Sequence, residues 1–191
     1  IITGTLDYGQ GHAVAFAQVL HSSLGIPFER IKLLQGDSDE LITGGGTGGS
    51  KSIMASGGAI IEAATEVIKK AKTVASYFFE TSEEDIEFKN GNLLVAGTDK
   101  SVSLLELSSK LKKGWDRSDG IPDTLDVKLD HGGVPSAFPN GCHICEVEID
   151  PETGAVRIDR YNMVNDFGVL VNPLLVEGQC HGGVALSLIH I

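Results

Sequence analysis

A glycine-rich stretch directly in front of a long helical pattern is the feature that most constrains this sequence. Residues 44–52 contain five glycines, three hydroxyl side chains and one lysine. An alanine-rich pattern with helical spacing follows, from Ser52 to about Phe79. Glycine lets a backbone pass close to a ligand, and a helix start presents free N–H groups with a partial positive charge. The stretch therefore predicts a cradle for an anion, most simply a phosphate, with a plain flexible loop as the alternative.

Two common phosphate-binding motifs match this stretch incompletely. Gly44, Gly46 and Gly49 have the spacing of the dinucleotide-binding motif, but a mostly polar segment separates them from the preceding strand pattern. Gly44 and Gly49 also have the spacing of a P-loop, but Ser50 stands at the lysine position and Lys51 comes one residue late. Because that lysine must reach the phosphate from a fixed point on the loop, neither motif explains the stretch.

Helical and strand patterns are mixed along the chain without a strict alternation, which indicates the α+β class, with mixed sheets and long helices. Strands are predicted over residues 1–7 and 31–35 and in two hairpins, residues 86–95 and 142–164; helices are predicted over residues 12–24, 52–79 and 104–111 and from residue 173 onward. The polar segment 113–137 predicts a loop that joins two sub-regions, residues 1–112 and 138–185.

Charge and cysteine content exclude several classes of protein. A net charge of −11 argues against nucleic acid and anionic membranes, because both attract clustered Lys and Arg. No apolar run approaches the roughly 20 residues that a membrane-spanning helix needs. Cys142, Cys145 and Cys180 are an odd number, which does not suggest the disulfide framework of a secreted protein. We therefore expect a cytoplasmic protein.

Two glutamines stand beside glycines at positions that suit a ligand. Gln10 lies in a Gly-Gln-Gly turn between a strand and a helix, and its amide can donate and accept hydrogen bonds to a heterocycle. A turn that only caps the helix is the alternative. Gln179 follows Gly178 in the last helix, where glycines destabilise the helix and so indicate close approach of a ligand or another backbone.

A Cys-His-Ile-Cys run at residues 142–145 suggests a metal site but does not complete one. Cys142 and Cys145 point to opposite faces of a strand, and the chain has no second pair of cysteines. Buried structural cysteines are the better interpretation.

Three segments together, in order and spacing, resemble the molybdopterin-binding large subunits of the xanthine dehydrogenase and aerobic carbon monoxide dehydrogenase family. They are Gly9-Gln10-Gly11-His12, the stretch 44–52, and the segment from Phe138-Pro139-Asn140-Gly141-Cys142-His143 to Asn172-Pro173-Leu174-Leu175-Val176-Glu177-Gly178-Gln179. The resemblance extends to about Ala185. It implies that the chain is a fragment of the molybdenum-cofactor-binding domain.

The resemblance implies a molybdenum-bearing molybdopterin dinucleotide, in its cytosine form, as the cofactor. The residues that it assigns to cofactor binding are Gln10, Gly11, Thr47, Gly48, Gly49, Ser50, Lys51, Ser52 and Gln179. It assigns no residue of this chain to the metal directly. The glycines then have a physical reason, since a pyrophosphate needs close backbone approach and helix-start donors.

The implied activity is that of an oxidoreductase, a molybdenum hydroxylase. Such an enzyme hydroxylates an aldehyde, a heteroaromatic or a similar carbon centre of a small molecule with water, or oxidises carbon monoxide. Its electrons leave through iron–sulfur clusters to FAD on partner subunits or domains, so we expect a hetero-oligomer.

The chain departs from the family pattern at several places. Lys51 stands where many relatives have arginine, which keeps the charge but loses a bidentate grip on phosphate. Residues 186–191 do not match, and we expect them to be a non-native tail. The family's glutamate base falls beyond Ile191, so we expect no catalytic residue and no activity in the chain by itself. The alternatives are a stand-alone phosphate- or nucleotide-binding module and a non-catalytic paralogue.

Overall fold

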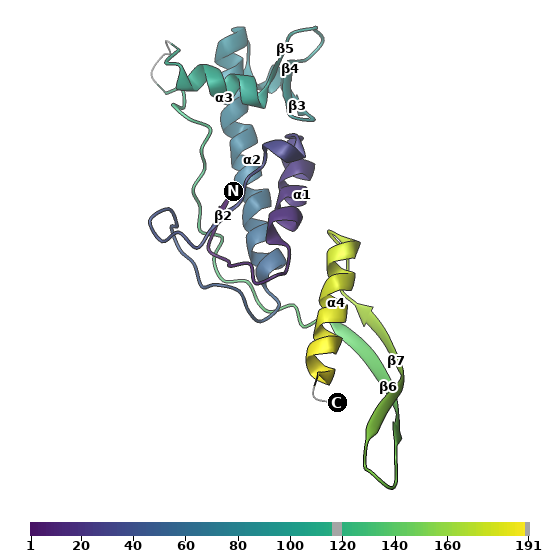
Figure 1. Cartoon of the computed structure of the whole chain (residues 1–191). Coiled ribbons are helices and arrows are strands. Elements are labelled where there is room, and N and C mark those ends of the chain that lie inside the picture. Colours follow the sequence, from purple (N-terminus) through teal and green to yellow (C-terminus); the bar gives the residue numbers. More distant parts are fainter. Residues whose placement is uncertain (116–119, 190–191) are drawn as a thin grey trace.

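Helix α2, Ser52–Phe79, is the axis around which the preceding elements and those up to residue 112 are arranged, whereas the C-terminal elements extend away from it (Figure 1). The structure is a computed structural model that describes residues 1–115 and 120–189. The 28 residues of α2 span about 42 Å at the usual rise of an α-helix. Helix α2 begins directly behind the glycine-rich stretch, as predicted, and ends at Glu80, whose backbone is left-handed with φ of 54°.

The C-terminal end of α2 packs in a small α+β unit. Strands β3 (Ile86–Lys89), β4 (Asn92–Val95) and β5 (Ser101–Ser103) form an antiparallel sheet in the order β3-β4-β5, next to helix α3 (Leu104–Lys112) and the short 3-10 helix η2 (Glu83–Asp85). The hydrophobic core lies between these elements and α2, and its fully buried side chains include Val74, Ile86, Leu93 and Leu107. The hairpin turn and α3 confirm the sequence prediction, whereas β5 was not predicted.

The N-terminal end of α2 lies beside helix α1 (His12–Leu24). Strands β1 (Ile2–Thr3) and β2 (Leu34–Gln35) pair in parallel, and the 3-10 helix η1 (Phe28–Arg30) lies between α1 and β2. The bounds of α1 agree with the prediction. The predicted strand over residues 1–7 is much shorter in the structure, because the backbone beyond Thr3 bonds to the glycine-rich stretch instead of to β2.

The segment between α3 and β6 has no helix or strand among its described residues, and residues 116–119 of the predicted loop 113–137 lie outside the described part. Its residues 120–137 run along α2 towards the glycine-rich stretch (Figure 1). Leu125 is buried in the hydrophobic core. Further along, His131 Nδ1 lies 2.6 Å from Glu62 Oε2. The division into two sub-regions stays a prediction.

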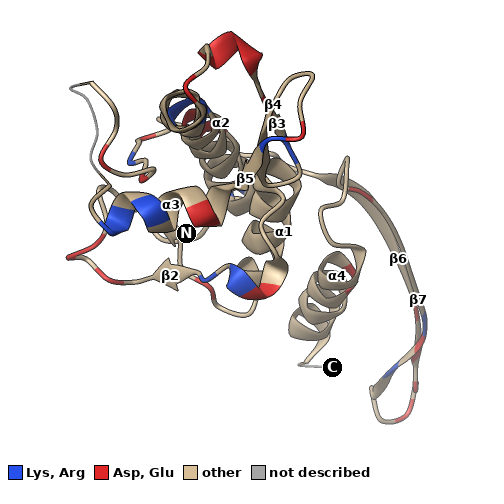
Figure 2. Ribbon diagram, turned by 90° about the horizontal axis from the view of Figure 1, so that it is seen from above, with Lys and Arg blue, Asp and Glu red and all other residues tan. Residues whose placement is uncertain are grey.

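The C-terminal part consists of one hairpin and one helix. Strands β6 (Asn140–Ile149) and β7 (Val156–Asp166) pair antiparallel with an irregularity at Glu146, and helix α4 (Pro173–Leu188) follows. No residue in these three elements is buried, so the prediction of buried cysteines is wrong for Cys142 and Cys145, which are exposed. Helices α1 and α4 carry almost no charged side chains (Figure 2). Of the predicted tail 186–191, residues 190 and 191 lie outside the described part.

Candidate functional site

The turn around Gln10 and the helix that carries Gln179 come together in the structure, although they are far apart in the sequence. Gln179 donates a hydrogen bond from Nε2 to the carbonyl oxygen of Gly9 at 3.1 Å. Leu175, one turn earlier on α4, packs on Gly11 so closely that a Cβ there would lie 2.7 Å from Leu175 Cδ2. Gly11 therefore lets α4 approach the start of α1.

Asp7 organises the Gln10 turn, and the sequence patterns did not indicate it. Its Oδ1 accepts hydrogen bonds from the backbone N–H groups of Gly9 (2.8 Å), Gln10 (2.7 Å) and Gly11 (3.3 Å), and its Oδ2 from that of His12 at 2.8 Å. An Asp two residues before a Gly-x-Gly turn is a known turn signal, because its side chain bonds backbone N–H groups that follow it.

The electrostatics of Asp7 follow from these bonds. Burial raises the pKa of the carboxyl group, but the four backbone N–H groups stabilise the charged form more, so the pKa lies below its ordinary value. A carboxylate therefore occupies the positive end of α1, where a phosphate would otherwise be attracted.

The two glutamines offer opposite hydrogen-bonding groups. Gln10 Oε1 accepts the backbone N–H of Tyr8, so its Nε2 is the group without a partner among the described residues. Gln179 uses Nε2 as the donor to Gly9, so its Oε1 has no partner in the described part of the chain. The pair thus presents one donor and one acceptor on neighbouring elements.

The glycine-rich stretch is held against the segment that follows β1. Gly46 donates its N–H to the carbonyl oxygen of Gly4 at 3.0 Å. The hydroxyl of Thr47 accepts the N–H of Leu6 at 3.1 Å and donates to the carbonyl oxygen of the same residue. Ser52 adds a hydroxyl contact to Thr47 at 3.4 Å. The side chain of Thr47 thus anchors the stretch to the chain.

The backbone of residues 48–52 turns sharply into α2. Gly49 has φ of 64° and Ser50 has φ of 53°, so a non-glycine residue holds a left-handed conformation at the helix start. Such conformations are uncommon outside glycine and concentrate at functional sites. Lys51 is the N-cap residue and makes no side-chain capping bond within the described residues.

Helix α2 therefore differs from the other two helices that start in this region. Asp7 occupies the start of α1, and the side chain of Asn172 caps α4 by accepting the N–H of Leu175 at 3.1 Å. Among these three helices in the described part of the chain, only α2 has no side chain that accepts a hydrogen bond from the N–H groups of its first turn. Its first N–H groups are available to an anion.

Open space adjoins the stretch. A Cβ added to Gly45 or Gly48 would meet no other atom within 4 Å, and the same is true at Gly9 in the Gln10 turn. By contrast, a Cβ at Gly4 would overlap the backbone of Gly44. The glycines thus divide into those that pack backbone on backbone and those that border unfilled space. The residues fit a phosphate-bearing, heterocyclic cofactor.

A buried polar cluster lies beneath the site. Gln35 Nε2 lies 2.8 Å from Thr5 Oγ1 and 3.3 Å from His12 Nδ1, and Thr5 contacts Ser56 of α2 at 3.3 Å. Burial lowers the pKa of His12, against smaller opposing effects of Asp7 and Gln35. His12 is therefore neutral near pH 7, and its Nε2 has no hydrogen-bond partner among the described residues.

The remaining candidates do not join this site. His143 of the Cys-His-Ile-Cys run bonds Tyr161 Oη at 2.9 Å and Asn165 Oδ1 at 3.0 Å. No group of three or more His, Cys, Asp or Glu in residues 1–115 and 120–189 could hold a metal. Within the same residues, no helix combines the length and apolar character needed to cross a bilayer.

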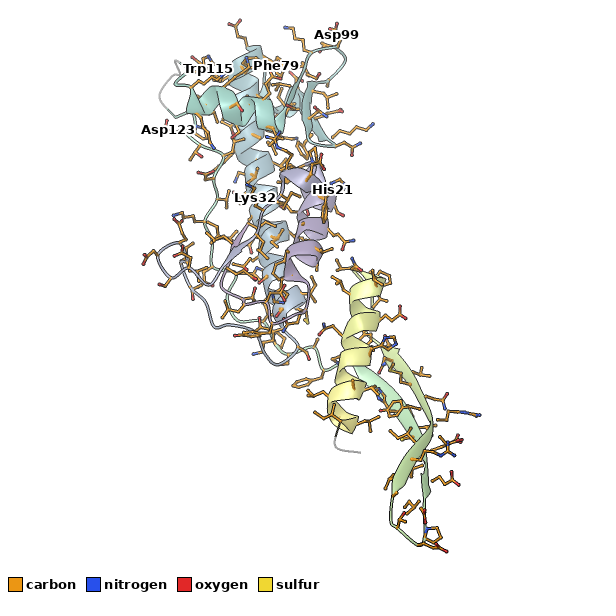
Figure 3. The ribbon with its side chains drawn as sticks, in the orientation of Figure 1. His21, Lys32, Phe79, Asp99, Trp115 and Asp123 are labelled. Atoms are coloured by element: carbon orange, nitrogen blue, oxygen red, sulfur yellow. The ribbon has the colours of Figure 1, made fainter. Side chains whose placement is uncertain are left out.

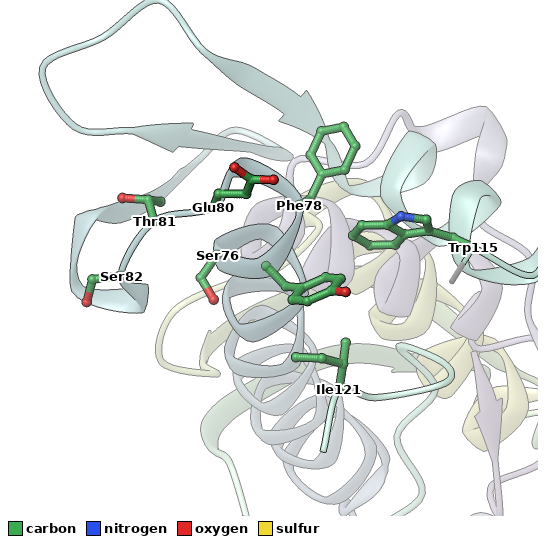
Figure 4. A pocket seen from close by; sticks show the side chains of 8 residues that line it. Ser76, Phe78, Glu80, Thr81, Ser82, Trp115 and Ile121 are labelled. Atoms are coloured by element: carbon green, nitrogen blue, oxygen red, sulfur yellow. The ribbon is translucent and has the colours of Figure 1, made fainter. Parts of the chain in front are cut away.

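A pocket lies at the opposite end of α2 (Figure 4), beside Phe79 and Trp115, which mark that end in Figure 3. It is lined by Ser76, Tyr77, Phe78, Glu80, Thr81, Ser82, Trp115 and Ile121. None of the predicted site residues lines it. The length of α2 separates it from the glycine-rich stretch by about 40 Å.

Known proteins resemble this chain over almost its whole length. A model of the molybdopterin cofactor-binding domain matches residues 1–188. The nicotine 6-hydroxylase large subunit of Paenarthrobacter nicotinovorans is 38% identical over 98% of this chain and 23% of its own length. The carbon monoxide dehydrogenase large chain of Hydrogenophaga pseudoflava is 34% identical over 95% of this chain and 22% of its own length.

A solved structure shows the same fold. The crystal structure of Cu,Mo-CO dehydrogenase superposes with a TM-score of 0.82 and 30% identity, over 96% of this chain and 23% of that one. The chain thus spans less than a quarter of the length of these relatives. The α+β class predicted from the sequence is confirmed. The chain belongs to the molybdopterin cofactor-binding domain family, that of the molybdenum hydroxylase large subunits.

Proposed function

We propose that this chain holds the pterin dinucleotide cofactor in the large subunit of a molybdenum hydroxylase. The observation that carries the proposal is that the glycine-rich stretch, which leads into the uncapped start of α2, is bonded through Thr47 to Leu6. Leu6 directly precedes the turn in which Gln10, together with Gln179, offers a donor and an acceptor. An anionic group and a heterocycle on one ligand need that combination.

We assign the residues as follows. Gln10 Nε2 and Gln179 Oε1 bind the heterocycle. The backbone N–H groups of residues 48–52, which include Gly48, Gly49, Ser50 and Ser52, bind the phosphates, and Lys51 adds a positive charge. Thr47 and Gly11 shape the site, because the hydroxyl of Thr47 holds the stretch to Leu6 and Gly11 lets Leu175 of α4 approach.

The bound cofactor supplies redox chemistry that no side chain of the site has. The chain contributes binding and orientation. The carboxylate of Asp7 bonds the backbone of the Gln10 turn. The ring of His12 is buried and neutral, so it adds no charge to the interior beneath this turn.

The same proposal covers the form of the cofactor, the substrate, the partners and the cellular location. We infer a cytosine dinucleotide, a small-molecule substrate, and iron–sulfur and FAD-bearing subunits or domains as partners in a hetero-oligomer. Two relatives, a nicotine 6-hydroxylase large subunit and a carbon monoxide dehydrogenase large chain, are named for small molecules, which supports a small substrate. A cytoplasmic setting is included because the cysteines are few, odd in number and free.

Gly48→Ala tests whether a ligand occupies the space beside the stretch. The added methyl group would meet no atom of this chain within 4 Å, so it leaves the chain undisturbed. Gly133→Ala is the matched control, because its Cβ also meets nothing and it lies outside the glycine-rich stretch. The measurement is molybdenum per protein by mass spectrometry, with the nucleotide released by acid hydrolysis, in the purified holoenzyme.

We expect Gly48→Ala to lower molybdenum and pterin content at least severalfold, and Gly133→Ala to leave both unchanged. Cytidine monophosphate in the hydrolysate would support the cytosine form. Full cofactor content in Gly48→Ala would overturn the assignment of the stretch. A wild-type protein that carries a nucleotide but neither molybdenum nor pterin would instead favour a nucleotide-binding module.

A further inference from the structure

Asp7 makes more hydrogen bonds to the site than any of the residues assigned above. Both of its carboxylate oxygens are used, and the four N–H groups that they accept belong to consecutive residues, from Gly9 to His12. One side chain thus fixes the whole turn that carries Gln10.

The shape of this turn depends on that carboxylate. Gly9 has φ of 106° and Gly11 has φ of 77°, so both glycines on either side of Gln10 are in conformations that other residues rarely adopt. A turn of two flexible glycines does not hold one shape by itself. The bonds to Asp7 compensate for that freedom.

The conformation of this turn determines which side-chain atom of Gln10 is exposed to a ligand. The N–H of Tyr8 engages Gln10 Oε1, and Gly9 offers its carbonyl oxygen to Gln179. Both bonds require the backbone between Asp7 and Gly11 to stay in place. Without the carboxylate, Gln10 Nε2 would no longer be held in one direction, and the bond between Gln179 and Gly9 would be lost as well.

We propose that Asp7 is a positioning residue, whose carboxylate holds the Gly9–Gly11 turn so that Gln10 directs Nε2, and Gln179 directs Oε1, at the cofactor. Because Asp7 acts through Gln10, its role rests on the proposed function. Asp7 itself touches no ligand, since all its oxygens face the turn.

Asp7→Asn is the test, since it keeps the size of the side chain. One oxygen can still accept, but the new amide group faces the N–H of His12, and the negative charge at the start of α1 is lost. Asp150→Asn is the matched control. Asp150 also accepts backbone N–H groups, from Glu152 at 2.8 Å and Thr153 at 3.2 Å, but in the β6–β7 turn.

The experiment uses the purified holoenzyme and two measurements that do not depend on a known substrate. They are molybdenum per protein and the Mo(V) electron paramagnetic resonance spectrum after partial reduction with dithionite. We expect Asp7→Asn to lower molybdenum content about tenfold, the size typical of residues that orient metal-site ligands, and to shift the spectrum of the remaining centre in the same direction as Gln10→Ala. Asp150→Asn should match the wild type in both.

The outcomes separate this inference from the proposed function. If Gln10→Ala changes the spectrum and Asp7→Asn does not, the positioning role is wrong and the cofactor site stands. If Gln10→Ala changes neither measurement, the assignment of Gln10 fails, and the role of Asp7 fails with it. If Asp7→Asn does not fold, Asp7→Glu replaces it, and a wild-type spectrum in that variant overturns the inference, because the longer side chain must displace the turn.

Discussion

Two adjacent glycines of α2 allow a sharp test of how the segment 120–137 is attached. His131 of this segment packs on Gly58, where an added Cβ would lie 2.7 Å from His131 Nε2. At Gly57, the nearest atom to such a Cβ is Ile53 Cδ1 at 3.6 Å, an ordinary contact. Gly58→Ala should therefore displace His131, and Gly57→Ala should not.

The magnitudes follow from the contacts. Each Gly→Ala change in a helix interior stabilises the helix by about 1 kcal/mol, so this gain is common to both variants. In Gly58→Ala the ring must also move by roughly 1 Å to reach an ordinary contact distance. That movement breaks the bond between His131 Nδ1 and Glu62 Oε2. Both side chains of this pair are partly exposed, at 33% and 55%, so we expect the bond to contribute only about 1 kcal/mol.

A loss of about 1 kcal/mol raises the open population of the segment roughly fivefold. Lys128 is exposed and lies three residues before His131, so trypsin can report this opening. The assay is the initial rate of cleavage after Lys128 in the native protein, followed by mass spectrometry under conditions where reclosing outpaces cleavage.

We expect Gly58→Ala to be cleaved about five times faster than Gly57→Ala, and His131→Ala to reproduce the faster rate. When His131 is already replaced by alanine, the further change Gly58→Ala should not increase the cleavage rate. Equal cleavage rates in the two glycine variants would refute the steric argument, and so would an additional effect in the double variant.

Three further predictions concern the site. Burial lowers the pKa of His12, so the unfolded chain takes up a proton below about pH 6.5 while the folded chain does not. The contribution of His12 to the free energy of unfolding should therefore be complete above that pH and decrease as the pH drops towards the folded pKa. Urea unfolding between pH 5 and 8 should show a flatter profile for His12→Asn, and parallel profiles would contradict the reasoning. Thr47→Val leaves the N–H of Leu6 without its partner and should lower the free energy of unfolding in urea by about 1–3 kcal/mol. Thr47→Ser keeps the hydroxyl and should lose much less stability. Asn172→Ala removes the cap of α4 and should cost about 1 kcal/mol, visible as faster amide exchange in the first turn of α4, with unchanged exchange speaking against it.

The elements that could be predicted from the sequence are those whose cause is local. Helix α1 ends at Gly25, which takes the left-handed conformation that closes a helix, and Asn90 with Gly91 forms the turn between β3 and β4. The start of α2 follows from the glycine-rich stretch. Each of these signals lies within a few residues of the feature that it determines.

The parts that could not be predicted depend on distant segments. The short strand β1 ends because Leu6 bonds Thr47, which is 41 residues away. The meeting of Gln179 with Gly9 follows from a few contacts of α4 with the start of α1 and its turn, such as that of Leu175 with Gly11, which no local pattern encodes. The exposure of Cys142 and Cys145 depends on what packs on the β6–β7 hairpin, and periodicity alone does not show that.

Helix α4 touches the first helix and its turn through Asn172, Leu175 and Gln179, at intervals of three and four residues. These intervals correspond to about two helical turns. The number of residues from the cap to the glutamine therefore determines which way Gln179 points. An insertion or deletion of one residue within 173–178 would rotate Gln179 by about 100° away from Gly9. A change of length in the β6–β7 turn would leave that alignment intact. A change of length at the tip of the hairpin therefore leaves the contact between Gln179 and Gly9 intact, whereas one in the first two turns of α4 breaks it.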